Sequence, residues 1–417
     1  MNNRVVITGL GTVNPLANDV PRFWGQLQAG VSGIRRVEQI ATDDLAVRIG
    51  GEVRDVPFGR AEINDHVCVR RMDNASLFAV LAAREALEDA GLIGTDLGER
   101  GAVVIGAGLA GLMTLQEQTE KLLGGGPRKV SPLTIPLLMP NAAAANISLA
   151  FGLQGTTYTV SSACASSGHA IIDAIRLIRD GEADVVVTGG SEASMTRLGF
   201  ASFINMRAMA KGNDESPSGA IRPFDARRDG LIMSEGAGVV IVESEEHARR
   251  RGRVPYAELI GYGMTSDAHH LTHPEPSAKM AARAVETSLS RAALRPGDIA
   301  GSLYVNAHGT GTKLNDAMET RALRTAFGES AERLQVSSTK SMTGHMIGAS
   351  CGIEMIACCL ALRDGVLPPT INLEQPDPEC DLDYVPGTAR RAQVEYALNN
   401  CFGFGGHNVS LLIRRWG

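Results

Sequence analysis

TTYTVSSACASSGHAIIDAIRLIRDG, residues 156–181, begins as a β-rich segment and continues as an amphipathic helix. Residues 157–160 are typical of a short buried strand, and a turn rich in Ser and Ala follows it. One face of the predicted helix carries Ile171, Ile175 and Ile178. Cys164 is predicted to be the first or second helical residue, where unpaired backbone N–H groups and the helix dipole favour a thiolate. The stretch therefore predicts a nucleophilic cysteine, with a small buried apolar residue as the alternative.

A second copy of this stretch lies near the C-terminus, in RLQVSSTKSMTGHMIGASCGIEMIACCLALRDG, residues 333–365. Three short motifs recur in the same order: Val-Ser-Ser at 160–162 and 336–338, Gly-His at 168–169 and 344–345, and Arg-Asp-Gly at 179–181 and 363–365. Motifs that recur in order indicate an internal duplication. We therefore expect an α/β protein of two similar halves, residues 1–250 and 251–417, whose Val-Ser-Ser turns lie together.

The composition is typical of an enzyme-sized globular protein, with 417 residues, 44% hydrophobic and 21% charged. A net charge of −6 argues against bulk nucleic-acid binding, which needs a basic surface. Seven cysteines without the spacing of a disulfide framework indicate a reducing compartment. Every apolar run is interrupted before it reaches membrane-spanning length. We expect a cytoplasmic protein that binds neither nucleic acid nor membrane.

Several patterns resemble known sites but lack the context those sites need. IGAGLAG (105–111) matches G-x-G-x-x-G, yet the acidic residue of a dinucleotide site would fall in a loop, so close backbone approach is the better interpretation. GASCG (348–352) matches G-x-S-x-G, but its Ser350 lies inside an apolar helical run. Cys351, Cys358 and Cys359 lack the spacing of zinc ligands. His269, His270 and His273 look more like metal ligands, but no acidic or thiol companions surround them. We expect no metal site.

A polar stretch rich in Gly and Pro, residues 211–230, predicts a surface loop or lid. By contrast, the helix predicted in the second copy is apolar on all sides, and Glu354 is its only formal charge between residues 341 and 362. Such a helix is typically buried. Because a buried carboxylate requires a partner, we expect Glu354 to pair with Lys340, the nearest cation in the sequence.

Three predicted turns carry residues of types that can take part in catalysis, one cysteine and two histidines. Cys164 follows one predicted strand, His345 follows the corresponding strand of the second copy, and His308 follows a third strand in VNAHGTGTKLND, residues 305–316. A single histidine is more often structural than catalytic. The carboxyl ends of strands are nevertheless where open α/β sheets bind ligands, so we expect these three residues in one site.

Four motifs together resemble the β-ketoacyl-acyl carrier protein synthases, especially the elongating type II enzymes with a Cys-His-His triad. They are ACASSG around Cys164, NAHGTGT around His308, KSMTGH from Lys340 to His345, and FGFGGHN at 402–408. The likeness runs from the first strand to the last in the same order. It implies the thiolase fold, a five-layered αβαβα duplication that agrees with the repeat above. It also implies a homodimer, and no cofactor beyond the phosphopantetheine arm by which acyl carrier protein holds the substrates.

The resemblance also implies a reaction. Cys164 would accept an acyl chain from a carrier thioester. Malonyl thioester would then lose carbon dioxide and condense with that chain, extending it by two carbons. His308 and His345 would donate N–H groups to the enolate oxygen. The backbone N–H groups of Cys164 and Phe404 would bind the second oxyanion, and Phe404, in the flexible GFGG segment, would act as a gate.

Further residues match family positions whose roles the resemblance supplies. Two would hold His345 in its working tautomer and orientation: Lys340 and Glu354. Asp316 would lie near the decarboxylation site. The pantetheine arm would be bound by Thr310 and Thr312. The acyl tunnel would be lined or gated by Leu109, Ile135 and Phe203, each of which would also suit a core position. The acidic carrier protein would meet Arg70, Arg71 and Arg207, which would also suit a solvated face.

The sequence departs from the family pattern at three places. Ser167 stands where enzymes of fatty acid synthesis usually have Gly, the HGTGT spelling is shared with polyketide ketosynthases, and Leu231 replaces an aromatic near the gate. The pathway therefore stays open between fatty acid elongation and specialised polyketide or polyene synthesis. A thiolase acting on coenzyme A esters is disfavoured, because thiolases use a second Cys where this chain has His345. A non-catalytic chain-length-factor subunit of a heterodimer is disfavoured because such subunits lack the nucleophile.

Overall fold

The computed structural model describes residues 4–61, 67, 69–212 and 215–417. Ten strands form one sheet in the order β10-β9-β13-β14-β8-β1-β7-β6-β4-β5. Five belong to the first half of the chain: β1 (Val5–Val13), β4 (Gly101–Gly106), β5 (Thr157–Val160), β6 (Val185–Glu192) and β7 (Gly236–Ser244). Five belong to the second half: β8 (Ala257–Ser266), β9 (Leu303–Asn306), β10 (Gln335–Ser337), β13 (Tyr396–Gly403) and β14 (His407–Arg415).

The strand pairing of the first half is repeated in the second. In the first half, β4 lies parallel to β5 and β6, and β7 runs antiparallel to β6 and β1. In the second half, β9 lies parallel to β10 and β13 in the same way, and β14 runs antiparallel to β13 and β8. The halves join where β1 pairs with β8, Val6 opposite Glu258 and Ile7 opposite Ala257. The duplication expected from the repeated motifs is therefore present in the sheet itself.

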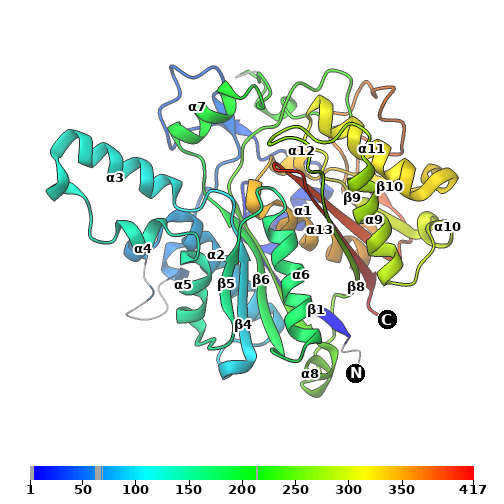
Figure 1. Cartoon of the computed structure of the whole chain (residues 1–417), viewed down its shortest axis with the longest axis horizontal. Coiled ribbons are helices and arrows are strands. Elements are labelled where there is room, and N and C mark those ends of the chain that lie inside the picture. The colour runs from blue at the N-terminus through cyan, green and yellow to red at the C-terminus, as the bar shows by residue number, and fades with distance from the viewer. Residues whose placement is uncertain (1–3, 62–66, 68, 213–214) are drawn as a thin grey trace.

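Helices form three layers around the two halves of the sheet (Figure 1). In the centre, α6 (Ser166–Arg179) and α13 (Ser350–Asp364) pack against each other and against strands of both halves. The outer layer of the first half contains α2 (Asn74–Ala90) and α5 (Ala142–Phe151). The outer layer of the second half contains α9 (Lys279–Arg291) and α11 (Lys313–Phe327). This arrangement confirms the five-layered thiolase fold, and it explains why α13 is apolar on all sides.

Shorter elements complete the fold. The remaining helices are α1 (Val20–Gln28), α3 (Leu112–Gly125), α4 (Thr134–Leu138), α7 (Arg197–Asn205), α8 (Glu245–Arg250), α10 (Pro296–Ile299) and α12 (Lys340–Thr343). Single 3₁₀ turns include η2 (Val69–Arg71) and η8 (Ile347–Ala349). Two small sheets pair β2 (Arg35–Arg36) with β3 (Ile49–Gly50), and β11 (Val366–Leu367) with β12 (Arg390–Arg391). Among the described residues, no helix has the length and apolar character needed to cross a membrane.

The glycines of residues 105–111 allow close backbone approach. A Cβ on Gly106 would lie 2.2 Å from the backbone nitrogen of Ser167, so the missing side chain lets α6 pack directly on β4. A Cβ on Gly108 would lie 2.7 Å from Ile347, which belongs to the second half. The glycine-rich segment therefore brings the turns of the two halves together, and the dinucleotide interpretation is not needed.

Candidate active site

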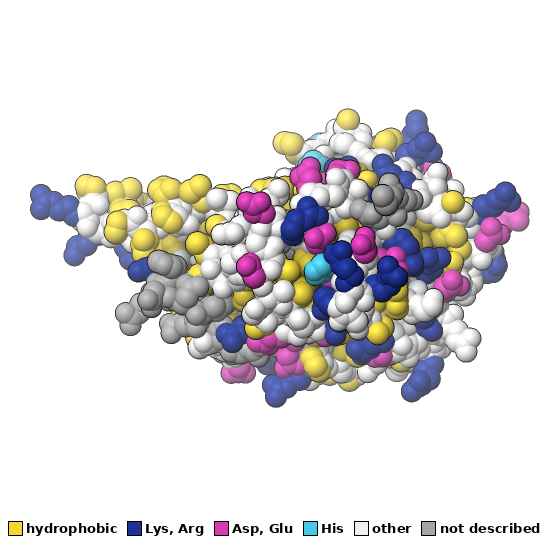
Figure 2. All heavy atoms as spheres, turned by 90° about the horizontal axis from the view of Figure 1, so that it is seen from below, with side chains coloured by type: hydrophobic (Ala, Val, Ile, Leu, Met, Phe, Trp, Pro, Cys, Tyr) yellow, Lys and Arg dark blue, Asp and Glu magenta, His cyan; other side chains and the backbone are white. Residues whose placement is uncertain are grey.

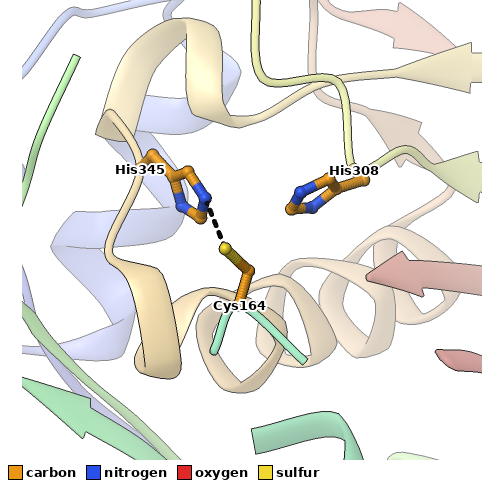
Figure 3. Close-up of side chains that lie close together, drawn as sticks. All are labelled: Cys164, His308 and His345. Atoms are coloured by element: carbon orange, nitrogen blue, oxygen red, sulfur yellow. Dashed lines mark hydrogen bonds between the residues drawn. The ribbon is translucent and has the colours of Figure 1, made fainter. Parts of the chain in front are cut away.

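Cys164, His308 and His345 lie around one cavity at the meeting of the two halves (Figure 3). The cavity has a volume of about 490 Å³. His345 Nε2 is 3.1 Å from Cys164 Sγ, and the two imidazole rings are 5.4 Å apart with an angle of 84° between their planes. All three side chains are buried. The structure thus brings together the three residues on which the sequence interpretation depends.

Cys164 lies in the turn between β5 and α6. The helix begins at Ser166, so the expectation that Cys164 is itself a helical residue is wrong by two positions. Ala163, directly before it, has a φ of +52°, a left-handed conformation that is uncommon for a residue with a side chain. Ser166 Oγ fixes the turn by accepting from Ser162 N at 2.9 Å and contacting the Ala163 carbonyl at 2.6 Å. The turn directs the thiol into the cavity.

The electrostatic environment of Cys164 differs from the sequence expectation. Burial raises the pKa of the Cys164 thiol to about 12, and nearby Cys401 adds to the rise. The backbone N–H groups of Phe404 and Cys164, together with the charge of Lys340, oppose this rise without cancelling it. Burial therefore favours the neutral thiol, against the sequence expectation of a thiolate, because desolvation outweighs the opposing backbone N–H groups and the charge of Lys340.

His345 has a defined tautomer. The backbone N–H of Ile347 donates to Nδ1 at 3.2 Å, so Nδ1 carries no hydrogen in the neutral ring. Ser350 Oγ lies 3.0 Å from the same nitrogen. The ring hydrogen is consequently on Nε2, which faces Cys164 Sγ.

The nitrogen and sulfur atoms of the triad lie within 4.8 Å of one another, close enough for a metal ion, but a nitrogen that bears hydrogen does not ligate a metal. The arrangement suits a carbonyl or enolate oxygen better than a cation.

Lys340 and Glu354 form a buried ion pair beside the triad, each side chain being 1% exposed. No hydrogen bond described in the structure joins either of them to His345, so the expectation that they set its tautomer is wrong. The charge of Lys340, by contrast, affects both histidine rings. Burial lowers the pKa of both His308 and His345 well below its ordinary value, and the Lys340 ammonium lowers it further. Both imidazoles are therefore neutral at physiological pH.

His308 is held by a residue that the sequence interpretation missed. Glu319, on α11 and fully buried, accepts the backbone N–H of His308 at 2.9 Å and that of Gly309 at 2.8 Å. Asn400 Nδ2 donates to the same carboxylate at 3.2 Å. Burial raises the pKa of Glu319 to about 7, against these hydrogen bonds. No local pattern in the sequence indicates this role, because the backbone N–H groups that Glu319 accepts meet it only in the folded chain.

Asp316 supports the neighbouring turn and does not line the cavity. Its carboxylate accepts the backbone N–H of Gly311 at 3.2 Å and that of Phe224 at 2.8 Å, and burial raises its pKa. Arg228, 2% exposed, lies 3.6 Å from Asp316 and donates to the backbone oxygen of Thr312. In the later part of the segment 211–230, Phe224, Asp225 and Arg228 are buried, whereas Ala226, Arg227 and Asp229 are exposed. The expectation of a surface loop or lid is therefore wrong for the three buried residues, because Arg228 has its partners inside the fold.

The other candidate residues divide by position. Those that line the cavity are Leu109, Phe203, Arg207, Thr310, Thr312 and Phe404. Ile135 lies on α4, is 61% exposed and does not line it. Arg71 is exposed in η2, and the side chain of Arg70 falls outside the described part of the structure. Within one chain, only some of the residues expected to line the acyl tunnel or to meet the carrier protein therefore lie at the cavity.

Phe404 lies in the turn between β13 and β14. Gly405 and Gly406 have φ values of +84° and +75°, which residues with side chains rarely adopt. The Phe404 ring stacks on Phe203, with centroids 6.5 Å apart and planes 21° apart. The backbone N–H of Gly405 donates to the Leu271 carbonyl at 2.7 Å. The sequence interpretation missed this contact, which no local pattern indicates.

The comparisons with known proteins follow the same motifs. Residues 2–248 match the family described as beta-ketoacyl synthase, N-terminal domain, and residues 256–374 match its C-terminal domain. The 3-oxoacyl-acyl-carrier-protein synthase 2 of Synechocystis sp. is 44% identical over 99% of this chain and 98% of its own length.

Two solved structures align over 100% of both chains, each with a TM-score of 0.91. One is a type II polyketide acyl-carrier protein in complex with its ketosynthase bound to a hexaketide, at 32% identity. The other is the ishigamide ketosynthase/chain length factor, at 34% identity. Since both family domains match in order and together span most of the sequence, the chain belongs to the beta-ketoacyl synthase family.

Proposed function

We propose that this protein is a β-ketoacyl-acyl carrier protein synthase that elongates an acyl chain by two carbons. The observation that carries the proposal is a buried thiol facing two neutral imidazoles across one cavity. The two halves, residues 1–250 and 251–417, contribute different parts of the reaction. The first supplies the nucleophile and the second supplies the groups that stabilise negative charge.

In the first step Cys164 takes the acyl chain from its carrier. The sulfur attacks the thioester carbonyl, and the bond from that carbon to the pantetheine sulfur breaks. The developing oxyanion is received by the backbone N–H groups of Cys164 and Phe404, which already lie against the sulfur. The proton of the neutral Cys164 thiol ends on the departing pantetheine thiolate, so the step needs no net proton.

In the second step malonyl thioester loses carbon dioxide. The bond to the carboxylate carbon breaks, and its electron pair moves onto the thioester oxygen as an enolate. His345 Nε2–H and the ring of His308 face the space where this oxygen would lie. A neutral N–H donor binds such an oxygen without protonating it, so the low pKa of both rings suits the task.

In the third step the enolate carbon attacks the acyl carbonyl on Cys164. A carbon–carbon bond forms, the bond to the Cys164 sulfur breaks, and the released thiolate takes a proton from solvent. Because burial favours the neutral thiol, this protonation returns the site to its resting state. Phe404 stacks on Phe203 at the cavity wall, so movement of the Phe404 turn would separate acylation from condensation.

The substrates would enter on the phosphopantetheine arm of acyl carrier protein. Thr310 and Thr312 lie at the cavity with their hydroxyls 3.0 Å apart, where they would bind the arm. The exposed Arg71 and Arg207, together with Arg70, would meet an acidic carrier. The solved ketosynthase in complex with acyl-carrier protein supports this partnership. The chemistry proposed here requires no cofactor beyond that arm.

We further propose that the protein works as a homodimer. Figure 2 shows hydrophobic side chains along the arm that α3 and α4 form. Its exposed apolar residues include Leu115, Leu122, Leu123, Leu133, Ile135 and Met139. Such a surface is typical of an interface, and the neighbouring edge strand β5 has a ladder partner on one side only among the described strands. A second copy covering this face would supply Ile135 to an acyl tunnel that one chain leaves incomplete.

Native mass spectrometry of the purified chain tests the assembly. We expect twice the mass of the chain, and Leu123→Arg should shift the protein toward monomer, whereas Leu271→Arg, an exposed change elsewhere, should not. A monomeric parent that dimerises only with a chain-length-factor-like subunit would support the heterodimer instead.

The proposed reaction is tested by incubating the protein with acyl carriers of graded chain length. Peptide mass spectrometry should find the acyl group on Cys164, and addition of malonyl carrier should release carbon dioxide and a β-ketoacyl product two carbons longer. The same acyl groups on coenzyme A serve as the control for a thiolase. Condensation of two coenzyme A esters without carbon dioxide release, or no acyl group on Cys164, would contradict the proposal.

A further inference from the structure

Ser350 lies at the start of α13, directly behind the ring of His345. Its hydroxyl oxygen is 3.0 Å from His345 Nδ1 and accepts the backbone N–H of Met346 at 3.1 Å. The side chain is 2% exposed. The sequence analysis set this residue aside as a nucleophile because it lies inside an apolar helical run, and gave it no role in the site. The structure places it against a ring of the proposed active site.

The hydrogen bonds around Ser350 fix which atom donates. Met346 N–H occupies a lone pair of the hydroxyl oxygen, so the hydroxyl hydrogen is free to point at His345 Nδ1. Nδ1 already accepts the backbone N–H of Ile347. A hydrogen on Nδ1 would face that amide hydrogen, so Nδ1 is an acceptor, and its single lone pair is shared by the Ile347 amide and the closer Ser350 hydroxyl.

The backbone at Ile347 shows that this arrangement is built into the turn. Ile347 has a φ of +44°, which is an outlier for a β-branched residue. Strain of this kind persists where the surrounding structure imposes it, and it clusters at functional sites. Here the strained turn aims the Ile347 amide at His345, and Ser350 completes the set from the first helical turn of α13.

We propose that Ser350 is a positioning residue that keeps His345 neutral with its hydrogen on Nε2, facing the reacting atoms. The inference deepens the proposed function and rests on it. A hydroxyl that donates to Nδ1 withdraws electron density from the ring, which strengthens the Nε2–H donor and discourages a second proton. His345 would therefore polarise the enolate oxygen without protonating it.

The two histidines differ in this support. His308 Nδ1 has Cys401 Sγ at 4.0 Å as its only contact among the described hydrogen bonds, and no hydroxyl reaches it. The other titratable groups that face His345 are Cys164, His308 and Lys340 with its partner Glu354. Replacing Ser350 changes none of them, so a change in the ionisation of His345 can be assigned to the hydroxyl.

A matched pair of variants isolates the hydroxyl. Ser350→Thr and Ser350→Val add the same bulk, and only Thr keeps the donor. With malonyl carrier and no acyl donor, we expect Ser350→Val to lower kcat for decarboxylation about 2- to 10-fold with KM unchanged, the effect of one neutral hydrogen bond. The acid limb of the pH–rate profile should move to higher pH, because the ring binds a proton more readily. Ser350→Thr should stay within about twofold of the parent by the same reasoning.

Ser288→Ala controls for the loss of a buried hydroxyl, since Ser288 Oγ donates to the Val285 carbonyl within α9 and has no other hydrogen bond among the described residues. This variant should leave both rate and profile unchanged. Equal rates and profiles for Ser350→Val and Ser350→Thr would overturn the proposal. A rise in KM alone, without movement of the acid limb, would overturn it as well.

Nitrogen-15 spectra of the histidine rings separate this inference from the proposed function. In the parent, His345 should show the Nε2–H tautomer across neutral pH, and in Ser350→Val it should take up a second proton at a higher pH. If the parent does not decarboxylate malonyl carrier, the proposed function fails and the spectra still decide the role of Ser350. Identical spectra for parent and Ser350→Val would refute that role.

Discussion

The turns of the two halves begin alike and then diverge. The Val-Ser-Ser motifs begin at residues 160 and 336, a spacing of 176, whereas the Arg-Asp-Gly motifs begin at 179 and 363, a spacing of 184. The second half therefore has eight more residues between its strand and the end of its helix. In the first half the chain passes from β5 almost directly into α6, but in the second it passes through α12 and η8 before α13 begins.

The additional residues explain how a duplicated fold acquires an asymmetric site. In register, Lys340 occupies the position of Cys164, so one turn presents a thiol and the other a buried charge. The extra segment carries His345 and Ile347 across to the first half. His169 shares the Gly-His motif with His345, but it lies inside α6 and its Nδ1 contacts Ser162 Oγ at 2.7 Å. The Gly-His repeat in the sequence is therefore not a repeat in the structure.

Removing the thiol of Cys164 is the strongest test of whether the two halves supply different parts of the reaction. We expect Cys164→Ala to lower acyl transfer more than about 10³-fold, as loss of a covalent nucleophile does. Decarboxylation of malonyl carrier should persist, because the charge-stabilising groups come from the second half. Transfer is measured by acylation of the protein and decarboxylation by carbon dioxide release. Loss of both activities in a folded variant would show that the two halves do not divide the work.

Breaking the buried ion pair tests the position equivalent to Cys164. Lys340→Met should lower the free energy of unfolding by about 3–5 kcal/mol, because it leaves the Glu354 carboxylate buried and unpaired. Burial already raises the pKa of Glu354 to about 7, and loss of Lys340 raises it further. The pKa of Glu354 in the folded variant then lies above its pKa in the unfolded chain, so folding disfavours the ionised carboxylate. The loss of unfolding free energy should therefore be largest above neutral pH and should shrink as the pH falls.

Denaturant unfolding at several pH values measures this effect. Lys340→Met combined with Glu354→Leu is the control, and it should recover most of the lost stability because no unpaired charge remains. A double variant as unstable as the single one would show that packing, not the charge pair, accounts for the loss.

Replacing each histidine compares the two oxyanion donors that we propose for the second half. His308→Ala and His345→Ala should each slow decarboxylation about 10²-fold, the typical weight of one oxyanion donor. His345→Asn keeps an N–H group and should recover part of the rate. Carbon dioxide release at saturating malonyl carrier is the measurement. A double alanine variant that decarboxylates at the parental rate would rule out these donors.

Much of this arrangement could be predicted from the sequence. The repeated motifs predict the duplication, and apolar strands followed by turns with Cys164, His308 and His345 predict where the site forms. Glu319 and Ser350 could not be assigned, because their roles depend on which backbone N–H and ring nitrogen meet them in space. The raised pKa of Cys164 could not be predicted either, because it results from the burial of the thiol in the folded chain.

The pH dependence of Cys164 alkylation tests that burial. With a pKa of about 12, the thiolate fraction should rise about tenfold per pH unit between pH 7 and 9, with no plateau near the ordinary cysteine value. The rate of iodoacetamide labelling, followed by peptide mass spectrometry, measures it. A small-molecule thiol under the same conditions supplies the reference curve. A plateau below pH 8 would indicate a thiolate stabilised in the free protein.

The smallest predicted effect concerns Ala163, the residue before Cys164. Ala163 has a φ of +52°, whereas Thr339, its counterpart before Lys340, has a φ of −66°. Ala163→Gly relieves a left-handed conformation worth about 1 kcal/mol or slightly more but adds freedom to the unfolded chain, so the free energy of unfolding should rise by less than about 1 kcal/mol.

The same substitution at Ala165, buried in the same turn with a φ of −87°, relieves nothing and should lower the free energy of unfolding by about 1 kcal/mol. Acyl transfer should fall several-fold in Ala163→Gly, because the freed turn no longer holds the sulfur against its backbone donors. If both variants are destabilised equally, Ala163 is not strained. The left-handed residue would then be incidental to the first turn, and the asymmetry between the halves would lie in the eight additional residues alone.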